Sequence, residues 1–247
     1  QMYQKALAGA PGPHTHVYWF NLGVLYGQNN LATDAENAYR SAIYVKPDFI
    51  QAWFNLGASV ERAGRKPHAI TIWQSMLDHP LVTRTKDVDM YIMVLNAMGR
   101  IHEEMRLFEK AEAFLLESLQ TQPDQPKVIQ HWVHLRQKQC KWPVMQALPQ
   151  VSVHQMLANT SPLAMLSLHD DPALQMMAAQ LFIKRKFDLP MSRLCPLEGY
   201  SHARVRVGYL SGDLCTHAVG LLLADLMENH DRERFESCPN HLQTCLS

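Results

Sequence analysis

The sequence has little of what disulfide-stabilised, nucleic-acid-binding or membrane-spanning proteins need. Its five cysteines are odd in number and widely spaced, and none forms a Cys-x-x-Cys pair, which argues against a disulfide framework or a zinc ribbon. Because 23 basic residues balance 23 acidic ones, no overall field attracts nucleic acid or an anionic membrane. The longest apolar stretch, residues 218–227, contains Asp225 and is too short to span a bilayer. We therefore expect a cytoplasmic protein that binds neither nucleic acid nor membrane.

What the sequence does have is a repeat. Trp-Phe-Asn-Leu-Gly occurs at residues 19–23 and again at residues 53–57, an offset of 34 residues. Small, large apolar and proline residues follow each copy at matching distances: Ala35, Tyr39, Ala42 and Pro47 after the first, and Ala69, Trp73 and Met76 after the second. These are the positions of the tetratricopeptide repeat, in which two helices pack small residues of one against the Leu-Gly surface of the other.

The repeat period predicts the organisation of the first 141 residues. It gives a partial repeat in residues 1–13, full repeats in about 16–47, 49–80 and 88–123, and a terminal first helix in 127–141. The third repeat comes late because eight residues are inserted around 79–87. Since the chain opens inside a second helix and begins with Gln1, we expect a fragment. Residues 142–202 follow as a helical bridge, in which Ser161 and Asp170 or Asp171 precede prolines and cap helices.

Residues 204–210 predict a β-strand, because they are rich in β-forming residues and have no helical period. It leads through a short polar loop into an apolar helix at about 218–229, and strand, loop and helix open a parallel α/β sheet. Phe235 and Glu236 begin a second strand that we expect Pro239 to interrupt. The predicted fold is therefore mostly α: a repeat solenoid, a helical bridge, the start of an α/β lobe at 203–236 and an atypical tail at 237–247.

His217 and Asp213 are the sharpest candidates for catalysis. Both lie in the strand-to-helix loop, where a histidine near helix N-terminal amides is placed to act on a sugar or phosphate oxygen. The structural alternative is that Asp213 binds loop amides and His217 caps the helix. The spacing of the nearby glycines does not fit a dinucleotide-binding fingerprint.

Asn21 and Asn55 are the candidates for substrate binding. They occupy equivalent slots of two repeats, where an amide both donates to and accepts from an extended peptide backbone, while Ala97 stands in the third slot. Alternatively, each amide bonds within its own solenoid. His131 and His134 share a helical face, but no third ligand is placed to complete a set, so we expect no metal site.

The order of the parts and residues 206–217, Arg-Val-Gly-Tyr-Leu-Ser-Gly-Asp-Leu-Cys-Thr-His, resemble the bacterial Spindly-like branch of the O-linked N-acetylglucosamine transferase family. In that family, repeats precede a two-lobed GT-B catalytic region. By resemblance, His217 matches the loop histidine of the sugar-transfer site and Asp213 the acidic residue of the strand-end turn. Asn21 and Asn55 match the asparagine ladder that holds protein substrates. Ala218 stands where many members have proline.

The resemblance implies transfer of a sugar from a UDP-sugar such as UDP-GlcNAc to Ser or Thr of proteins, with inversion and without a metal or other cofactor. From Ser237 the sequence departs from the family's next strand, and the nucleotide-binding lobe does not follow. We therefore expect that this chain alone transfers no sugar. The alternative function is a non-catalytic repeat scaffold that binds a peptide or partner protein in its groove.

Overall fold

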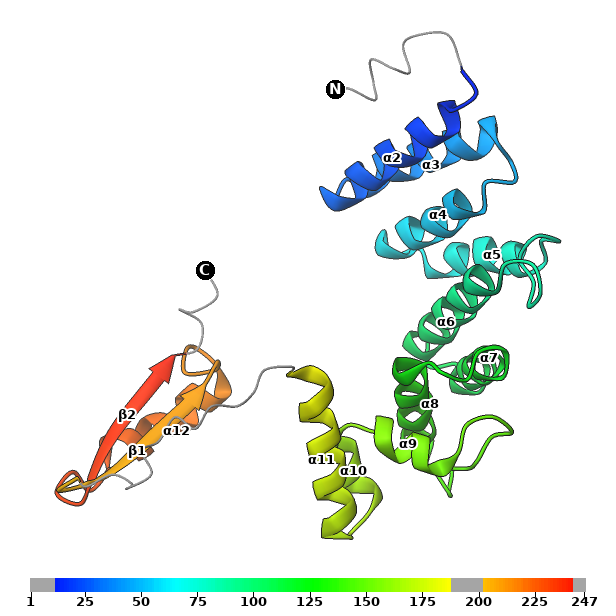
Figure 1. Ribbon diagram of the computed structural model, residues 1–247. Coiled ribbons are helices and arrows are strands. Elements are labelled where there is room, and N and C mark those ends of the chain that lie inside the picture. The colour runs from blue at the N-terminus through cyan, green and yellow to red at the C-terminus, as the bar shows by residue number, and fades with distance from the viewer. Residues whose placement is uncertain (1–11, 188–201, 242–247) are drawn as a thin grey trace. The chain divides into compact units, whose positions relative to one another are not determined.

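The computed structural model describes residues 12–187 and 202–241, and the chain divides into two compact units, residues 1–188 and 189–247 (Figure 1). The prediction of a mostly helical chain is confirmed. The repeats of unit 1 are three helix pairs followed by a single helix: α2 (Thr15–Gln28) and α3 (Ala32–Val45), α4 (Ile50–Arg62) and α5 (Lys66–Leu77), α6 (Val88–Glu104) and α7 (Phe108–Thr121), then α8 (Pro126–Lys138). The partial repeat predicted for residues 1–13 falls mainly on residues 1–11, which lie outside the described residues.

Each helix pair packs a glycine of its first helix against a large side chain of its second. A Cβ atom on Gly57 would lie 2.7 Å from Cε2 of the buried Trp73 indole. The same contact recurs 34 residues earlier, where Gly23 meets Tyr39, and in the third repeat, where Gly99 meets Leu115. Glycine is therefore needed here because a large side chain fills the space that its own side chain would take.

The turn that ends each first helix contains one residue in the left-handed conformation. This residue is Asn30 in the first repeat, Gly64 in the second and Arg106 in the third, with φ angles of 59°, 80° and 59°. Cys140, at a φ of 52°, follows α8 at the corresponding place. Thus α8 ends as the other first helices do, with a left-handed residue that closes the helix C-terminus.

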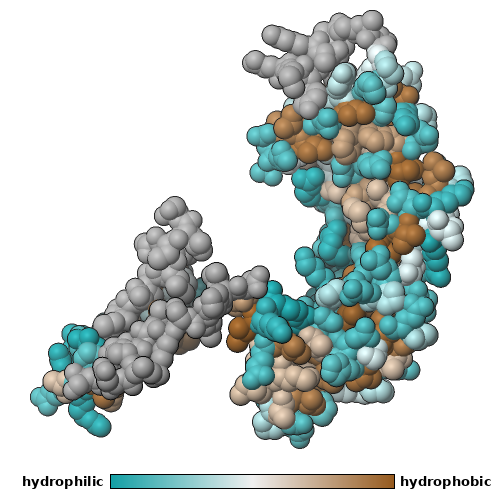
Figure 2. All heavy atoms as spheres, in the orientation of Figure 1, coloured by the Kyte–Doolittle hydropathy of each residue, from teal (hydrophilic) through white to brown (hydrophobic). Residues whose placement is uncertain are grey.

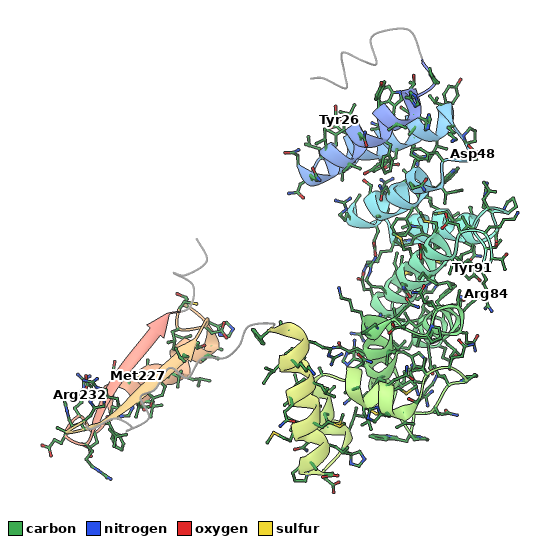
Figure 3. All side chains as sticks on the ribbon, viewed as in Figure 1. Tyr26, Asp48, Arg84, Tyr91, Met227 and Arg232 are labelled. Atoms are coloured by element: carbon green, nitrogen blue, oxygen red, sulfur yellow. The ribbon has the colours of Figure 1, made fainter. Side chains whose placement is uncertain are left out.

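The predicted insertion forms the connection between α5 and α6, residues 78–87. Val82 is fully buried, and Arg84, labelled in Figure 3, donates a 2.9 Å hydrogen bond to Glu117 of α7. Tyr91 of α6 donates to the same carboxylate at 2.5 Å. Burial raises the pKa of Glu117, but these two hydrogen bonds outweigh it and bring the pKa below its ordinary value. The insertion is thus anchored at both an apolar and a charged point.

Buried side chains gather in two neighbouring cores. The first contains residues from Ala35 to Ile101 and includes Trp73 and Val82. The second contains residues from Ala111 to Met156 and includes Trp132. The boundary between the cores falls between α6 and α7, inside the third repeat.

Arg136 closes the end of the repeats. Its guanidinium stacks on the Trp132 ring, with Cζ 4.9 Å from the ring centroid, and pairs with Glu112 of α7 at 2.7 Å. It also donates to the backbone carbonyls of Pro143 and Val144, both at 3.0 Å. One buried cation therefore ties α7, α8 and the start of the bridge together.

The bridge continues as α9 (Val153–Asn159), α10 (Pro162–Leu168) and α11 (Pro172–Lys186). Ser161 caps α10 by accepting from the Ala164 amide at 3.3 Å, and Asp171 caps α11 by accepting from the Ala173 amide at 2.8 Å. Both caps are followed by a proline at the first helical position, as predicted. The bridge packs onto the repeats as part of the same compact unit.

Unit 2 is a strand–helix–strand unit of β1 (Val205–Ser211), α12 (Ala218–Glu228) and β2 (Phe235–His241). The strands are parallel and in register from Val205 opposite Phe235 to Ser211 opposite His241. The expectation that Pro239 interrupts the second strand is wrong. Proline lacks only the amide donor, and an edge strand tolerates it where that amide would point away from the ladder.

Candidate functional site

The first helices of unit 1 present a continuous row of accessible side chains. Repeat counting places the same helical positions of α2, α4 and α6 in one row, in which Val24 and Ala58 also pack partly against the first core. The space-filling view shows unit 1 hollowed along the side on which α4, α6 and α8 lie, and the hollow carries mainly hydrophilic residues (Figure 2). We call this the first-helix face; its half-buried or exposed residues are Val17, Val24, Gln28, Gln51, Ala58, Arg62, Met93, Arg100 and Glu104.

Asn21 and Asn55 lie beside this face at the predicted equivalent positions, and both are half-buried. Asn55 precedes Ala58 by three residues, so the two are neighbours on the surface of α4. Among the described residues, none forms a hydrogen bond with the Asn55 side chain, which leaves its amide open to a ligand. Ala97, in the third slot, is buried, so the row of amides ends after the second repeat.

Ion pairs between neighbouring first helices fix the spacing of the face. Arg100 of α6 donates two hydrogen bonds, 2.6 and 2.7 Å long, to the two carboxylate oxygens of Glu61 on α4. The bond to Glu61 raises the pKa of Arg100 above its usual value. Between α6 and α8, Glu103 accepts from Lys138 at 2.7 Å and also pairs with His131.

The pair of Glu103 and His131 also accounts for one of the two histidines considered as metal ligands. Within residues 12–187 and 202–241, no three His, Cys, Asp or Glu side chains gather as a metal site. His134 is exposed and does not join this pair. The interaction of His131 with a residue 28 positions earlier carries no sequence signal, because only the stacking of α6 on α8 brings the two together.

Asp213 and His217 lie together in the loop between β1 and α12. The Oδ2 atom of Asp213 is 4.0 Å from Nδ1 of His217, too far for a direct hydrogen bond, and both side chains are about half exposed. Nδ1 of His217 instead accepts from the Val219 amide at 3.3 Å and caps α12. When the ring is neutral, this bond places its proton on Nε2 and leaves that atom available as a donor.

Gly220, in the first turn of α12, holds the loop in this shape. A Cβ atom there would collide with the Cys215 carbonyl and would lie 3.0 Å from the carbonyl of Asp213. Because both obstacles are backbone atoms, they cannot move aside as a flexible side chain does. Gly220 is one of the glycines whose spacing does not fit a dinucleotide-binding fingerprint, and its close approach to the loop backbone gives the reason for it.

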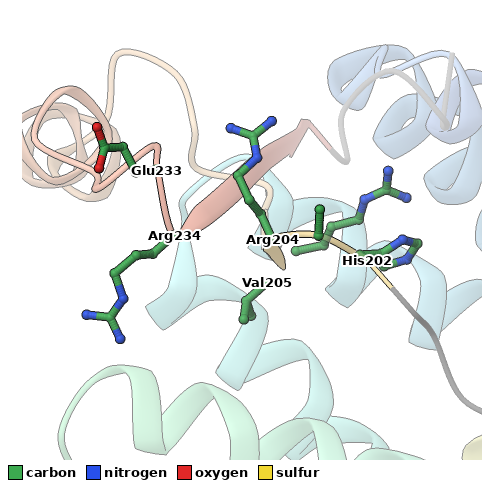
Figure 4. Close-up of a pocket in the computed structure, with 7 residues that line it drawn as sticks. His202, Arg204, Val205, Glu233 and Arg234 are labelled. Carbon is green, nitrogen blue, oxygen red and sulfur yellow. The ribbon is translucent and has the colours of Figure 1, made fainter.

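Another opening in unit 2 lies at the N-terminal end of β1. It has a volume of about 890 Å³, and its lining includes His202, Arg204, Arg206 and Arg234 (Figure 4). Arg206 is paired with Glu236 at 2.9 Å, and the side chains of Arg204 and Arg234 point away from one another in the figure. The opening therefore presents no converging set of donors, and it lies at the opposite end of β1 from Asp213 and His217.

Comparison with known proteins agrees with the architecture of unit 1. Residues 16–49 match the family described as tetratricopeptide repeat. The fold of unit 1 resembles that of tetratricopeptide-repeat solenoid proteins. No curated protein matches the chain. No described helix has both the length and the apolar character to cross a bilayer.

Several solved structures are similar to the chain. Pseudomonas aeruginosa pilF is 16% identical, with a TM-score of 0.56, over 75% of this chain and 82% of that one. A tetratricopeptide repeat protein from Parabacteroides merdae is 14% identical, with a TM-score of 0.51, over 74% of this chain and 64% of that one. A Thermobaculum terrenum O-GlcNAc transferase mutant is 18% identical over 92% of this chain and 37% of that one, with a TM-score of 0.44 that supports no argument about function.

Proposed function

We propose that unit 1 binds an extended segment of a partner protein along the first-helix face. The observation that carries this proposal is the Asn55 amide, which is half-buried, lies beside the face and has no hydrogen-bond partner among the described residues. An amide supplies both a donor and an acceptor, so it pairs with the N–H and C=O of any peptide backbone. Asn21 supports the proposal by standing at the same position of the preceding repeat.

The rest of the face suits such a ligand. Val24 and Ala58 give the segment small apolar contacts near Asn21 and Asn55, while the paired Arg100 and Glu61 hold α4 and α6 at a fixed distance. A surface whose helices do not move on binding loses less conformational freedom when the ligand binds. The expected ligand is therefore an unfolded or loop segment, recognised mainly through its backbone.

The test is peptide binding. A fluorescent peptide selected from a random display library on the purified chain is titrated by fluorescence anisotropy against the wild type, Asn21→Ala and Asn55→Ala. Each substitution removes one amide, and a net hydrogen bond is worth about 0.5–1.5 kcal/mol, so each variant should bind roughly 2–10 times more weakly. Asn37→Ala is the matched control, because Asn37 is exposed on the second helix α3. Unchanged affinity of Asn55→Ala would contradict the proposal.

As a second candidate, we infer that unit 2 belongs to a region that transfers sugar, of the O-linked N-acetylglucosamine transferase type. Support comes from the similarity of residues 206–217 to that family and from the position of Asp213 and His217 at the carboxyl end of a parallel strand, where ligands bind in α/β sheets. In this role His217 would meet the donor or acceptor oxygen through Nε2.

UDP-GlcNAc is the probe for this second candidate. We expect it to shift the imidazole NMR signals of His217 in the wild type, and we expect no turnover of radiolabelled UDP-GlcNAc by this chain alone. Unchanged His217 signals at millimolar UDP-GlcNAc would argue against the transferase assignment and leave the binding scaffold as the function. Turnover would overturn the expectation of inactivity, and peptide binding by unit 1 is measured independently of both results.

A further inference from the structure

Helix α11 is apolar on two opposite faces, and only one of them is covered. Ala178 is buried, and Leu174 and Leu181, on the same side of the helix, are half-buried against the rest of the bridge. The opposite side carries Met176, Ile183 and Phe187, which are 60%, 43% and 56% exposed. Their spacing of seven and then four residues places them in one stripe along the helix. Exposed Gln180 lies between Met176 and Ile183 on this side, so the stripe is apolar on either side of one polar residue.

The neighbouring helix α10 also carries exposed apolar residues. Leu163 and Leu166 are 79% and 61% exposed, and the space-filling view shows brown and tan residues gathered at this end of unit 1 (Figure 2). We call Leu163, Leu166, Met176, Ile183 and Phe187 the α10–α11 patch. Large apolar side chains exposed together at one end of a unit mark an interaction surface.

The charges around the patch identify a partner. Asp170 and Asp171 stand just before the first residue of α11 and are exposed, whereas Lys184 and Lys186 stand exposed in its last turn. Asp170 is wholly accessible, and Lys186 lies over the Phe182 ring of its own helix, with Nζ 5.3 Å from the ring centroid. Two such helices laid antiparallel place the acidic end of each beside the basic end of the other. The patch is therefore complementary to itself under a two-fold rotation.

We propose that a second copy of this chain covers the patch, with the two α11 helices packed antiparallel about a two-fold axis. The 15 residues of α11 give a contact about 22 Å long. Five apolar side chains on each side make an interface below the standard size, so the dimer is weak and reversible, with a dissociation constant in the micromolar range.

Sedimentation velocity over a range of concentrations tests the dimer. The wild type should shift from monomer to dimer as concentration rises. Met176→Glu should weaken association by about tenfold or more, because it places a charge in the apolar stripe. Met105→Glu is the matched control, since Met105 is a methionine exposed to 38% at the end of α6. Circular dichroism confirms that each variant keeps its helical content.

A charge-exchange experiment tests the antiparallel geometry. Asp170→Lys with Asp171→Asn makes the N-terminal end basic while keeping a capping side chain, and Lys184→Glu with Lys186→Glu makes the C-terminal end acidic. Each variant alone places like charges together and should dimerise about tenfold more weakly, whereas an equimolar mixture should regain wild-type association. The proposal would be overturned if the wild type stayed monomeric at hundreds of micromolar, or if the mixture associated no more tightly than either variant alone. Either result would mean that a different partner covers the patch.

Discussion

Gly57→Ala is the substitution that tests the packing inside the repeats most directly. In an exposed helix, this change stabilises by about 1 kcal/mol, because alanine has the higher helix propensity. Here the new methyl group would stand 2.7 Å from Cε2 of Trp73 and 2.8 Å from its Cδ1. The indole is 1% exposed and its Nε1 donates to the Phe54 carbonyl at 3.3 Å, so the ring cannot swing into solvent without losing that bond.

The expected result follows from the balance of these effects. Overpacking a well-filled core costs about 1–3 kcal/mol, and loss of the indole hydrogen bond adds about 1 kcal/mol, against about 1 kcal/mol gained in propensity. The net loss is therefore about 1–3 kcal/mol, or a fall in melting temperature of roughly 2–10 °C for a unit of this size. The measurement is thermal and urea unfolding followed by circular dichroism.

Two further variants give the control and the coupling. Gly27→Ala is the matched control, because its methyl group would meet only the flexible Arg62 guanidinium, 3.3 Å away, and should be neutral or stabilising. Combining Gly57→Ala with Trp73→Leu should cost less than the sum of the two single changes, since the smaller side chain makes room for the methyl group. The contact with Trp73 would not be the reason why position 57 needs glycine if Gly57→Ala were as stable as the wild type. The same would follow if the effects of Gly57→Ala and Trp73→Leu were strictly additive.

Three other changes have definite expected outcomes. Arg106→Gly should raise the urea midpoint by the equivalent of about 1 kcal/mol, because glycine adopts the left-handed conformation without the strain of a side chain. A lower midpoint would show that the Arg106 side chain contributes more to stability than its backbone strain costs. Val82→Ala should cost about 1.5–3 kcal/mol in the same assay if the insertion is part of the first core, and almost nothing if residues 78–87 are only a tether. Burial raises the pKa of Glu112, but hydrogen bonds from Lys141 and Arg136 outweigh this effect and bring the pKa below 4.5. The ionised carboxylate therefore stabilises the fold above pH 4.5, and this stabilisation is lost as the pH falls through the lower pKa of the folded state. Urea midpoints between pH 7 and pH 3 should therefore fall less steeply for Glu112→Gln than for the wild type, and parallel curves would contradict this.

The repeats were predictable because their residues obey a period. Ala35, Ala69 and Ala111 are all fully buried, as the offset from each Trp or Leu position requires, and the insertion lies where the third repeat falls out of phase. The strand at 205–211 and the helix at 218–228 were also predictable, since the change from alternating to helical spacing is local.

What the sequence did not reveal depends on contacts between distant residues. Nothing near Arg136 indicates that it binds Glu112 and the Pro143 carbonyl. Packing of α8 on α7 brings Glu112 to it, and the bridge must fold back to bring the carbonyl. The prediction for Pro239 was wrong because it considered only the missing amide of proline. Whether a strand tolerates proline depends on which side of the strand that amide would face. The sequence positions of Asn55 and His217 were enough to select them as candidates. That the Asn55 amide has no hydrogen-bond partner among the described residues, and that His217 caps α12, is seen only in the three-dimensional structure.

The division of unit 1 into two cores has a consequence for how the chain comes apart. In a linear array each repeat touches only its neighbours, so opening can begin at either end and stop where the next core begins. The third repeat contributes buried residues of α6 to the first core and of α7 to the second. Phe114 of α7, which packs against the first core, and the contact of Gly99 with Leu115 both join the two cores. Denaturation should therefore pass through a half-folded intermediate, and proteases should first cut the chain near Met105, between the two halves.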